Sequence, residues 1–416
     1  MLNRPRHEEF ELFLDWLRTT IIERRIDALL VAGDVFDTTT PGPRAQRLYY
    51  EFLASLQGTC CRHIVVIGGN HDSPRLLDAP RSLLETLHVH VVGGVEANED
   101  GATNFDREVI VLEDGDGRPE AVVCAVPYLR ERDISWAMAD DSAGDKESRL
   151  IGAIRDHYAA VAAKAEALRE EIRKCFQIVV PLLGMGHLFA VGGVENAVIA
   201  ENSETYGENV RDLYVGSLGA VRRVDFPEVF DYVALGHLHL PLCVEGSELF
   251  RYSGSPIPMG FGESGKPKIV LEIEFTKSQS TAKPSVAKIE VPCFRRLVSL
   301  KGDAKSLQQS VRSLEKSLLS TWVELFFQES HDVFELGRRV TEWTKGLPVE
   351  VLRFTVELPV PAESSQRSPT IELLDEIAIL ELCLDVADVS VDLRDPYRRC
   401  YREILFAMQQ EEPAEE

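Results

Sequence analysis

The 416-residue sequence predicts an α/β fold, because apolar strands alternate with amphipathic helices and polar loops follow the strands. Residues 6–25 place apolar side chains on one helical face, and the apolar run 26–32 that follows leads into a glycine and two aspartates. A second helix, at about 43–57, precedes another apolar run at 63–67 and a second polar loop. In α/β folds, functional groups gather at the carboxyl ends of the strands.

The next elements extend the sheet. Residues 107–126 predict a hairpin, because two apolar runs flank the turn residues 114–117. A long charged helix rich in alanine is expected at 149–174, followed by two apolar strands, 178–187 and 231–239, that end in histidine. Two further strands and a polar turn are expected at 251–258, 267–275 and 276–285.

The character of the sequence changes near residue 293, which predicts a second domain. Strands and helices alternate there in a small α+β unit, at 295–302, 304–319, 322–329, 332–346 and 349–358. We therefore expect a core over 1–292, a cap domain over 293–360, a polar linker over 361–370 and a helical C-terminal segment over 371–416.

The composition excludes one class of nucleic-acid-binding protein. With 45 Lys and Arg against 68 Asp and Glu, the formal net charge is −23, so bulk positive charge cannot hold nucleic acid. A nucleic-acid enzyme that meets phosphates through metal ions stays open. No apolar run approaches the ~18 residues of a membrane span, and none of the eight cysteines forms a C-x-x-C pair. We expect a cytoplasmic protein with reduced thiols and no membrane contact.

Four loops carry residues suited to metal binding. Each follows an apolar strand, where side chains from separate strands can converge, and they are G-D-V-F-D (33–37), G-N-H-D (69–72), G-H (186–187) and G-H-L-H (236–239). Asp, Asn and His supply oxygen and nitrogen ligands for Mn, Fe or Zn. A carboxylate such as that of Asp34 can bridge two ions, whereas the imidazoles of His187, His237 and His239 bind one each.

Two ions roughly 3.5–4 Å apart would activate a water and clamp a phosphoryl centre. His71 follows Asn70, so it can point toward the substrate and stabilise charge or protonate the leaving oxygen. Asp72 can orient His71 as a hydrogen-bonding partner. Alone, a G-D-x-x-D or a Gly-His pair is more often a turn or a helix cap, but the four loops in this order favour a metal site.

These motifs resemble the calcineurin-like metallophosphoesterase superfamily, and within it the nuclease subunits of bacterial SbcCD complexes. The resemblance runs through about 8–275 and continues more loosely beyond. It is carried by IDALLVAGDVFDT (26–38), VVIGGNHDS (65–73), DLYVGSL (212–218), FDYVALGHLH (230–239) and RYSGSPIPMGF (251–261).

The resemblance implies a two-layer core of mixed β-sheets flanked by helices, with two manganese ions, or else magnesium. It assigns Asp34 as the bridging ligand, Asn70, His187 and His237 to one metal, His239 to the other, and His71 as the catalytic histidine. The implied reaction is hydrolysis of DNA phosphodiesters, by exonuclease action on ends and endonuclease cuts at hairpins, coupled to ATP use by a partner.

The resemblance also implies a cap that shapes DNA access and a segment, 371–416, that docks on an SbcC-type coiled-coil ATPase, within a heterotetramer holding two nuclease subunits. Apolar residues spaced among acids in 371–384, and a second helix at about 395–409, need a surface to cover, and packing on the chain's own cap is the alternative.

Five arginines close to the loops are candidates for contact with the DNA backbone, or else solvated surface residues: Arg44, Arg47, Arg75, Arg130 and Arg132. Residues 260–267 nearly match a phosphate-binding G-x-x-x-x-G-K-[ST] loop. Pro267 replaces the hydroxyl residue, and a strand follows where a helix is required. We therefore expect no nucleotide site in this chain.

One departure from the family pattern concerns the first metal. The family begins with a strand ending in Asp-x-His, yet no histidine here has an aspartate two residues before it, and only His7 precedes Asp34. The first metal would keep Asp34 and His239 alone, and neighbouring strand edges would be exposed. We expect a start codon placed too late or a truncated chain. The alternatives are a genuine one-metal protein, a non-catalytic scaffold, or a phosphodiesterase acting alone on a small molecule.

Overall fold

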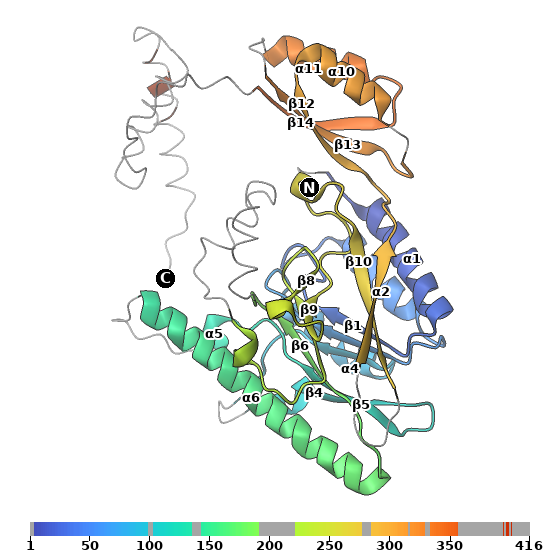
Figure 1. Cartoon of the computed structure of the whole chain (residues 1–416), viewed down its shortest axis with the longest axis vertical. Coiled ribbons are helices and arrows are strands. Elements are labelled where there is room, and N and C mark those ends of the chain that lie inside the picture. Colours follow the sequence, from blue (N-terminus) through green and yellow to red (C-terminus); the bar gives the residue numbers. More distant parts are fainter. Residues whose placement is uncertain are drawn as a thin grey trace. The chain divides into compact units, whose positions relative to one another are not determined.

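The computed structural model describes residues 4–98, 103–134, 143–190, 221–276, 284–314, 317–328 and 333–356, with 394, 397, 398 and 401 (Figure 1). Contacts group residues 1–357 into one unit and 358–416 into another. The expected linker 361–370 lies outside the described residues, as does nearly all of 371–416.

A three-stranded parallel sheet forms the first layer of the core, in the order β1-β2-β3. Helix α1 precedes this sheet in the chain, and further helices connect its strands. In chain order the elements are α1 His7–Arg24, β1 Ala28–Ala32, α2 Pro43–Ser55, β2 His63–Ile67, α3 Pro74–Asp78, α4 Arg81–Glu85 and β3 Val89–Val92. Ile21 of α1 and Leu53 of α2 pack on Ile64 and Val66 of β2, which confirms the expected helix–strand alternation.

The second layer is a six-stranded mixed sheet in the order β4-β5-β6-β7-β9-β8. Strands β5, β6, β7 and β9 are parallel to one another. At the two edges, β4 pairs antiparallel with β5 and β8 pairs antiparallel with β9. The bounds are β4 Val109–Glu113, β5 Pro119–Ala125, β6 Leu182–His187, β7 Tyr232–Gly236, β8 Leu242–Cys243 and β9 Phe250–Tyr252. The expected hairpin at 107–126 is β4 with β5.

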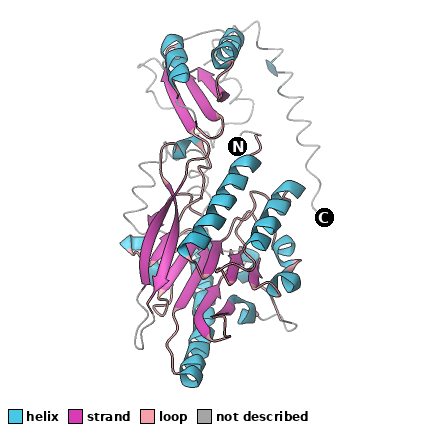
Figure 2. Ribbon diagram, turned by 90° about the vertical axis from the view of Figure 1, so that its right-hand side faces the viewer, coloured by secondary structure: helices cyan, strands magenta, loops and turns pink. Residues whose placement is uncertain are grey.

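The two sheets face each other across one hydrophobic layer, to which β2 contributes Val65 and Ile67 and the second sheet contributes Val123 and Met185. The long helix α6, Ala143–Phe176, covers the other face of the second sheet through residues such as Tyr158 and the small side chains beside it. Figure 2 shows the strands inside and helices outside them. The α/β fold with two sheets flanked by helices is therefore confirmed.

A hairpin of β10 Lys268–Phe275 and β11 Pro284–Val291 adds apolar side chains to the same layer. The sequence predicts a turn up to residue 285, but β11 already begins at Pro284. Among the described strands, β1 pairs with β2 alone, and each of its five residues is partly exposed, whereas every residue of β2 is buried. The strand that leads into Asp34 is thus an edge strand.

Residues beyond 293 form a separate three-stranded parallel sheet, β12 Leu297–Gly302, β13 Thr321–Phe327 and β14 Val349–Val356. Helices α10 Ala304–Ser313 and α11 Val333–Thr344 cover one of its faces (Figure 2). Helix α10 ends earlier than the sequence predicts, because Leu314 adopts an extended backbone. The remaining short helices of the described residues are η1 Phe105–Glu108, α5 Glu131–Ile134, η2 Arg223–Asp225, η3 Val244–Gly246 and η4 Phe261–Glu263.

None of the helices in the described ranges carries an apolar stretch that would cross a bilayer.

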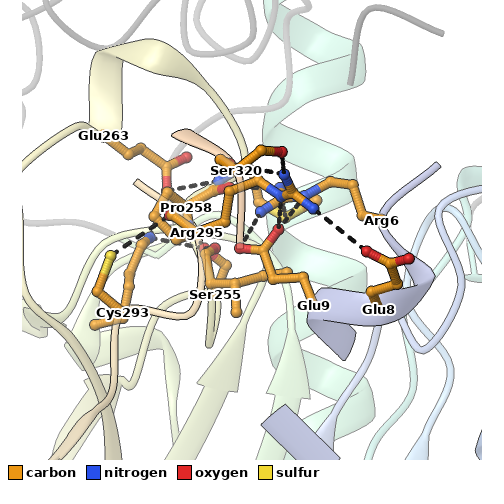
Figure 3. Close-up of polar contacts among 12 residues, drawn as sticks. Arg6, Glu8, Glu9, Ser255, Pro258, Glu263, Cys293, Arg295 and Ser320 are labelled. Atoms are coloured by element: carbon orange, nitrogen blue, oxygen red, sulfur yellow. Dashed lines mark hydrogen bonds and ion pairs between the residues drawn. The ribbon is translucent and has the colours of Figure 1, made fainter. Parts of the chain in front are cut away.

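A buried carboxylate links α1 to the sheet of β12, β13 and β14 through Arg295. Glu9 is 1% exposed and accepts two hydrogen bonds from Arg6, at 3.0 and 2.7 Å. Glu9 also forms an ion pair with Arg295, whose Nε lies 3.7 Å from Glu9 Oε2. The Arg295 guanidinium lies 4.3 Å from the centre of the Trp322 ring and donates to the Ser320 carbonyl (Figure 3). Two arginines therefore share one buried carboxylate, and Arg295 also lies 3.8 Å from the exposed carboxylate of Glu8.

We predict that Glu9→Ala lowers the free energy of unfolding by about 3–5 kcal/mol, because it leaves the buried Arg6 guanidinium without its carboxylate and removes the buried one of the two carboxylates beside Arg295. The matched control is Glu11→Ala on the same helix, which removes an exposed ion pair with Arg44 and is expected to cost less than about 1 kcal/mol. Urea denaturation measures both, and equal losses would contradict the assigned role of Glu9.

Candidate metal centre

Residues from both sheets meet at the carboxyl ends of their strands. Asp34 and Asn70 follow β1 and β2 of the first sheet, while His187 ends β6 and His237 follows β7 of the second. Because the strands within each group are parallel, their carboxyl ends lie at the same edge. The structure therefore brings together four of the five metal ligands that the sequence predicts.

The orientation of His187 fixes the chemistry of the centre. Its Nδ1 lies 2.8 Å from the carbonyl oxygen of Ala32, so Nδ1 carries the hydrogen and the neutral ring keeps a lone pair on Nε2. That lone pair faces two oxygen acceptors, Asn70 Oδ1 at 2.9 Å and Asp34 Oδ2 at 3.2 Å. Three electron-rich atoms that face one another need a cation between them or an extra proton.

His237 completes the group through the same side-chain oxygen of Asn70. Its Nδ1 lies 3.0 Å from Asn70 Oδ1, and its ring centre is 5.2 Å from that of His187. Burial, together with neighbouring His187, lowers the pKa of His237 to about 4, so its imidazole is neutral near pH 7 and offers a lone pair. Burial alone would raise the pKa of Asp34, but the opposing effects of the neighbouring His187 imidazole and of the hydrogen bond donated by the His71 amide are larger, so the pKa of this carboxyl lies below its usual value.

These donors fit a divalent transition-metal ion. The ligand atoms of Asp34, His187 and His237 all lie within 4.8 Å of one another, and the Asn70 oxygen lies among them. A carboxylate, an amide oxygen and two neutral imidazoles form a mixed donor set of the kind that holds Mn, Fe or Zn.

Glycines and strained residues allow the loops to approach so closely. A Cβ atom on Gly69 would lie 2.1 Å from Asp34 Oδ1, and one on Gly236 would lie 1.7 Å from the Ala32 carbonyl oxygen. Asp34 and His237 themselves adopt positive φ angles of 50° and 103°. Such angles are costly outside glycine and are typical of functional positions.

Asp72 holds two of the loops together through their backbones. Its carboxylate is fully buried and accepts hydrogen bonds from the amides of Gly69, Val35 and Phe36 at 2.9, 3.1 and 2.9 Å. Its described hydrogen bonds reach backbone groups and not the His71 ring, which differs from the orienting role that the sequence predicts. His71 is exposed, and its backbone amide donates to Asp34 Oδ1 at 3.0 Å.

His239, the fifth predicted ligand, lies outside the cluster of Asp34, His187 and His237. Its Nδ1 instead lies 3.3 Å from Oε1 of Glu263, and its side chain is 36% exposed. The assignment of His239 to a second metal stays a prediction.

One predicted basic residue lies at the centre. Arg130 donates from Nη2 to the Asp72 carbonyl at 2.9 Å and lies 5.7 Å from the centre of the Tyr128 ring. The Tyr128 ring meets that of His187 edge-on, 6.1 Å between centres. Tyr128 is not among the residues predicted from the sequence, although its position just after a buried strand was a usable signal.

Within the described part of the chain, the three other candidate arginines with described side chains show no contact with the cluster. Arg44 forms an ion pair with Glu11, and Arg47 and Arg75 are exposed. Arg132 belongs to α5, and its side chain lies outside the described residues.

Comparisons with known proteins agree with this geometry. The calcineurin-like phosphoesterase family matches residues 6–135. The chain is 34% identical over 398 residues to SbcD, the D component of the nuclease SbcCD, of Escherichia coli K12, which covers 94% of this chain and 92% of that protein. The proteins of the same name from Rhodobacter capsulatus and Bacillus subtilis are 36% and 30% identical, covering 62% and 65% of this chain and 59% and 62% of theirs.

We predict that Asp72→Ala lowers the free energy of unfolding by at least about 2 kcal/mol, because three backbone amides lose their acceptor. Binding of Mn²⁺ should weaken as well, since the loops that carry Asp34 and Asn70 lose their link. Asp37→Ala, which changes an exposed aspartate in the loop that carries Asp34, is expected to change stability by less than about 0.5 kcal/mol. Urea denaturation and calorimetric Mn²⁺ titration measure both effects, and the same result for the two variants would count against this role of Asp72.

Proposed function

The chain belongs to the SbcD family of nuclease subunits, and we propose that it is the nuclease subunit of an SbcCD-type complex that hydrolyses phosphodiester bonds in DNA. It is a metal-dependent hydrolase of the nuclease type. The observation that carries the proposal is the His187 lone pair held against the oxygens of Asp34 and Asn70, because a divalent ion at that point satisfies all three.

We propose manganese as the metal. Asp34, Asn70, His187 and His237 would hold one ion, and His239 with Asp34 would serve a second. Two imidazoles favour manganese over magnesium, which prefers an all-oxygen shell, although magnesium remains the alternative. The bound ions would supply a hydroxide nucleophile and neutralise charge on the phosphoryl oxygens.

The side chains of this protein would then carry out the remaining steps. His71 follows Asn70 and is exposed, so it can reach a phosphodiester above the metal ligands and donate a proton to the leaving oxygen. Asp34 is held in place by the His71 amide, and Asp72 keeps the two loops in register. Arg130 beside Asp72 is a candidate contact for a phosphate of the DNA backbone.

The proposed substrate and partner are those that membership of the family suggests. We propose exonuclease action at DNA ends and endonuclease action at hairpins, in repair and recombination. ATP would be used by an SbcC-type coiled-coil ATPase that binds residues 371–416, within a heterotetramer holding two nuclease subunits. The names of the relatives support a complex, since each is called a subunit of SbcCD. A non-catalytic scaffold is the alternative, favoured by the absence of an Asp-x-His pair from this sequence.

We predict that His71→Ala lowers manganese-dependent cleavage of duplex DNA by about 10²–10⁴-fold, because a general acid is lost while the metal ligands remain. Calorimetry should show unchanged Mn²⁺ affinity, and His7→Ala in the first turn of α1 should leave both measurements unchanged. Chelation with EDTA should abolish cleavage. A wild-type chain that binds Mn²⁺ but cleaves no DNA would favour the scaffold.

A second prediction concerns the partner segment. Leu374→Glu with Ile377→Glu should abolish co-purification with a co-expressed coiled-coil ATPase, because charges replace two apolar residues of the expected interface. Manganese-dependent cleavage by the isolated chain should persist. Ser365→Glu in the expected linker serves as the control, and retention of the ATPase by the double variant would exclude this segment as the docking site.

A further inference from the structure

Glu263 is a buried carboxylate beside a predicted metal ligand. It ends the short helix η4, is 6% exposed, and lies with one oxygen 3.3 Å from Nδ1 of His239. Its other oxygen accepts the Met259 amide at 3.1 Å and forms an ion pair with Lys268, which is 5% exposed. Glu263 belongs to the segment 260–267, whose sequence nearly matches a phosphate-binding loop but lacks its hydroxyl residue and its helix.

The same group of residues also holds the backbone of His239. Lys268 Nζ donates to the His239 carbonyl at 2.8 Å, and the Ser255 amide donates to it at 3.1 Å. Gly254 allows this approach, because its φ is +81° and a Cβ there would lie 2.8 Å from the same carbonyl oxygen. Both the ring and the peptide of His239 are therefore fixed by one cluster, defined as the partly buried Ser255 with the buried Glu263 and Lys268.

A carboxylate at Nδ1 determines where an imidazole carries its hydrogen. The neutral ring donates Nδ1–H to the carboxylate and keeps its lone pair on Nε2, as in carboxylate–histidine–metal triads. An ionised Glu263 matches this role, because Lys268 balances its charge in the same buried space.

Arg6, which immediately precedes α1, also holds the loop that carries Glu263. Arg6 donates to the carbonyl of Pro258 and contacts the sulfur of Met259 at 4.0 Å. Figure 3 shows Arg6, Pro258, Ser255 and Glu263 in the same region as Arg295. The Glu263 carboxylate therefore lies on a loop that is held in place. A group can orient another side chain only when it is itself fixed in this way.

We propose that Glu263 is a positioning residue that keeps the hydrogen of His239 on Nδ1 and so presents Nε2 to a divalent cation. The proposal rests on the proposed function, because a metal ion is the intended ligand of Nε2. It assigns no contact between Glu263 and the substrate. A purely structural ion pair between Glu263 and Lys268 is the competing explanation.

The first measurement is the tautomer of His239 in the full, metal-free chain, by long-range ¹H–¹⁵N correlation on ¹⁵N-histidine-labelled protein near pH 7.5. His239→Gln identifies the signal. We expect the Nδ1–H form in the wild type and in Glu263→Gln, whose side-chain oxygen still accepts the bond. We expect a shift toward the Nε2–H form in Glu263→Ala/Lys268→Met, which removes the pair without leaving a buried charge.

The second measurement is a calorimetric Mn²⁺ titration of the same variants. The double variant should bind Mn²⁺ about 10–100-fold more weakly at the site that His239→Gln also removes, and Glu263→Gln should restore most of the affinity. An unchanged tautomer in a folded double variant would overturn the proposal. A wild type that binds no Mn²⁺ would defeat the proposed metal centre, while the tautomer of the metal-free chain would still decide the role of Glu263.

Discussion

The hydrogen bond between His187 Nδ1 and the Ala32 carbonyl is the interaction on which the centre depends. Ala32 ends the edge strand of one sheet and His187 ends a central strand of the other, so this bond joins the two layers at the point where the ligands meet. It also sets the tautomer of His187 and turns Nε2 toward Asp34 and Asn70. The apolar layer between the sheets fixes the distance over which the bond can form.

The sequence was sufficient to identify most of the centre, for a physical reason. Each of Asp34, Asn70, His187 and His237 follows a glycine at the end of an apolar run, and the structure shows that glycine is needed where loops from two sheets crowd together. The strands and helices around them were also predictable, since burial on both faces leaves near-continuous apolar runs. Side-chain type, spacing and position at the strand ends therefore all indicate the same site.

Long-range contacts could not be predicted in the same way. Asp72 looked like a partner of His71 because they are adjacent, but its carboxylate reaches amides more than thirty residues away in the chain, at Val35 and Phe36. Glu263 stood in a segment that resembled a different motif, and only folding places it against His239. Strand β11 was missed because half of its eight residues are exposed and only Val291 is buried, so its sequence lacks the continuous apolar run that indicates a buried strand.

The positive φ angles of Asp34 and His237 mean that two ligands of the centre have strained backbones. Each residue stores conformational energy on the order of 1–3 kcal/mol, and each is attached to a different sheet. Such conformations persist only because the surrounding structure holds them in place. The ligand geometry therefore depends on the packing of the two sheets against each other and not on either sheet alone.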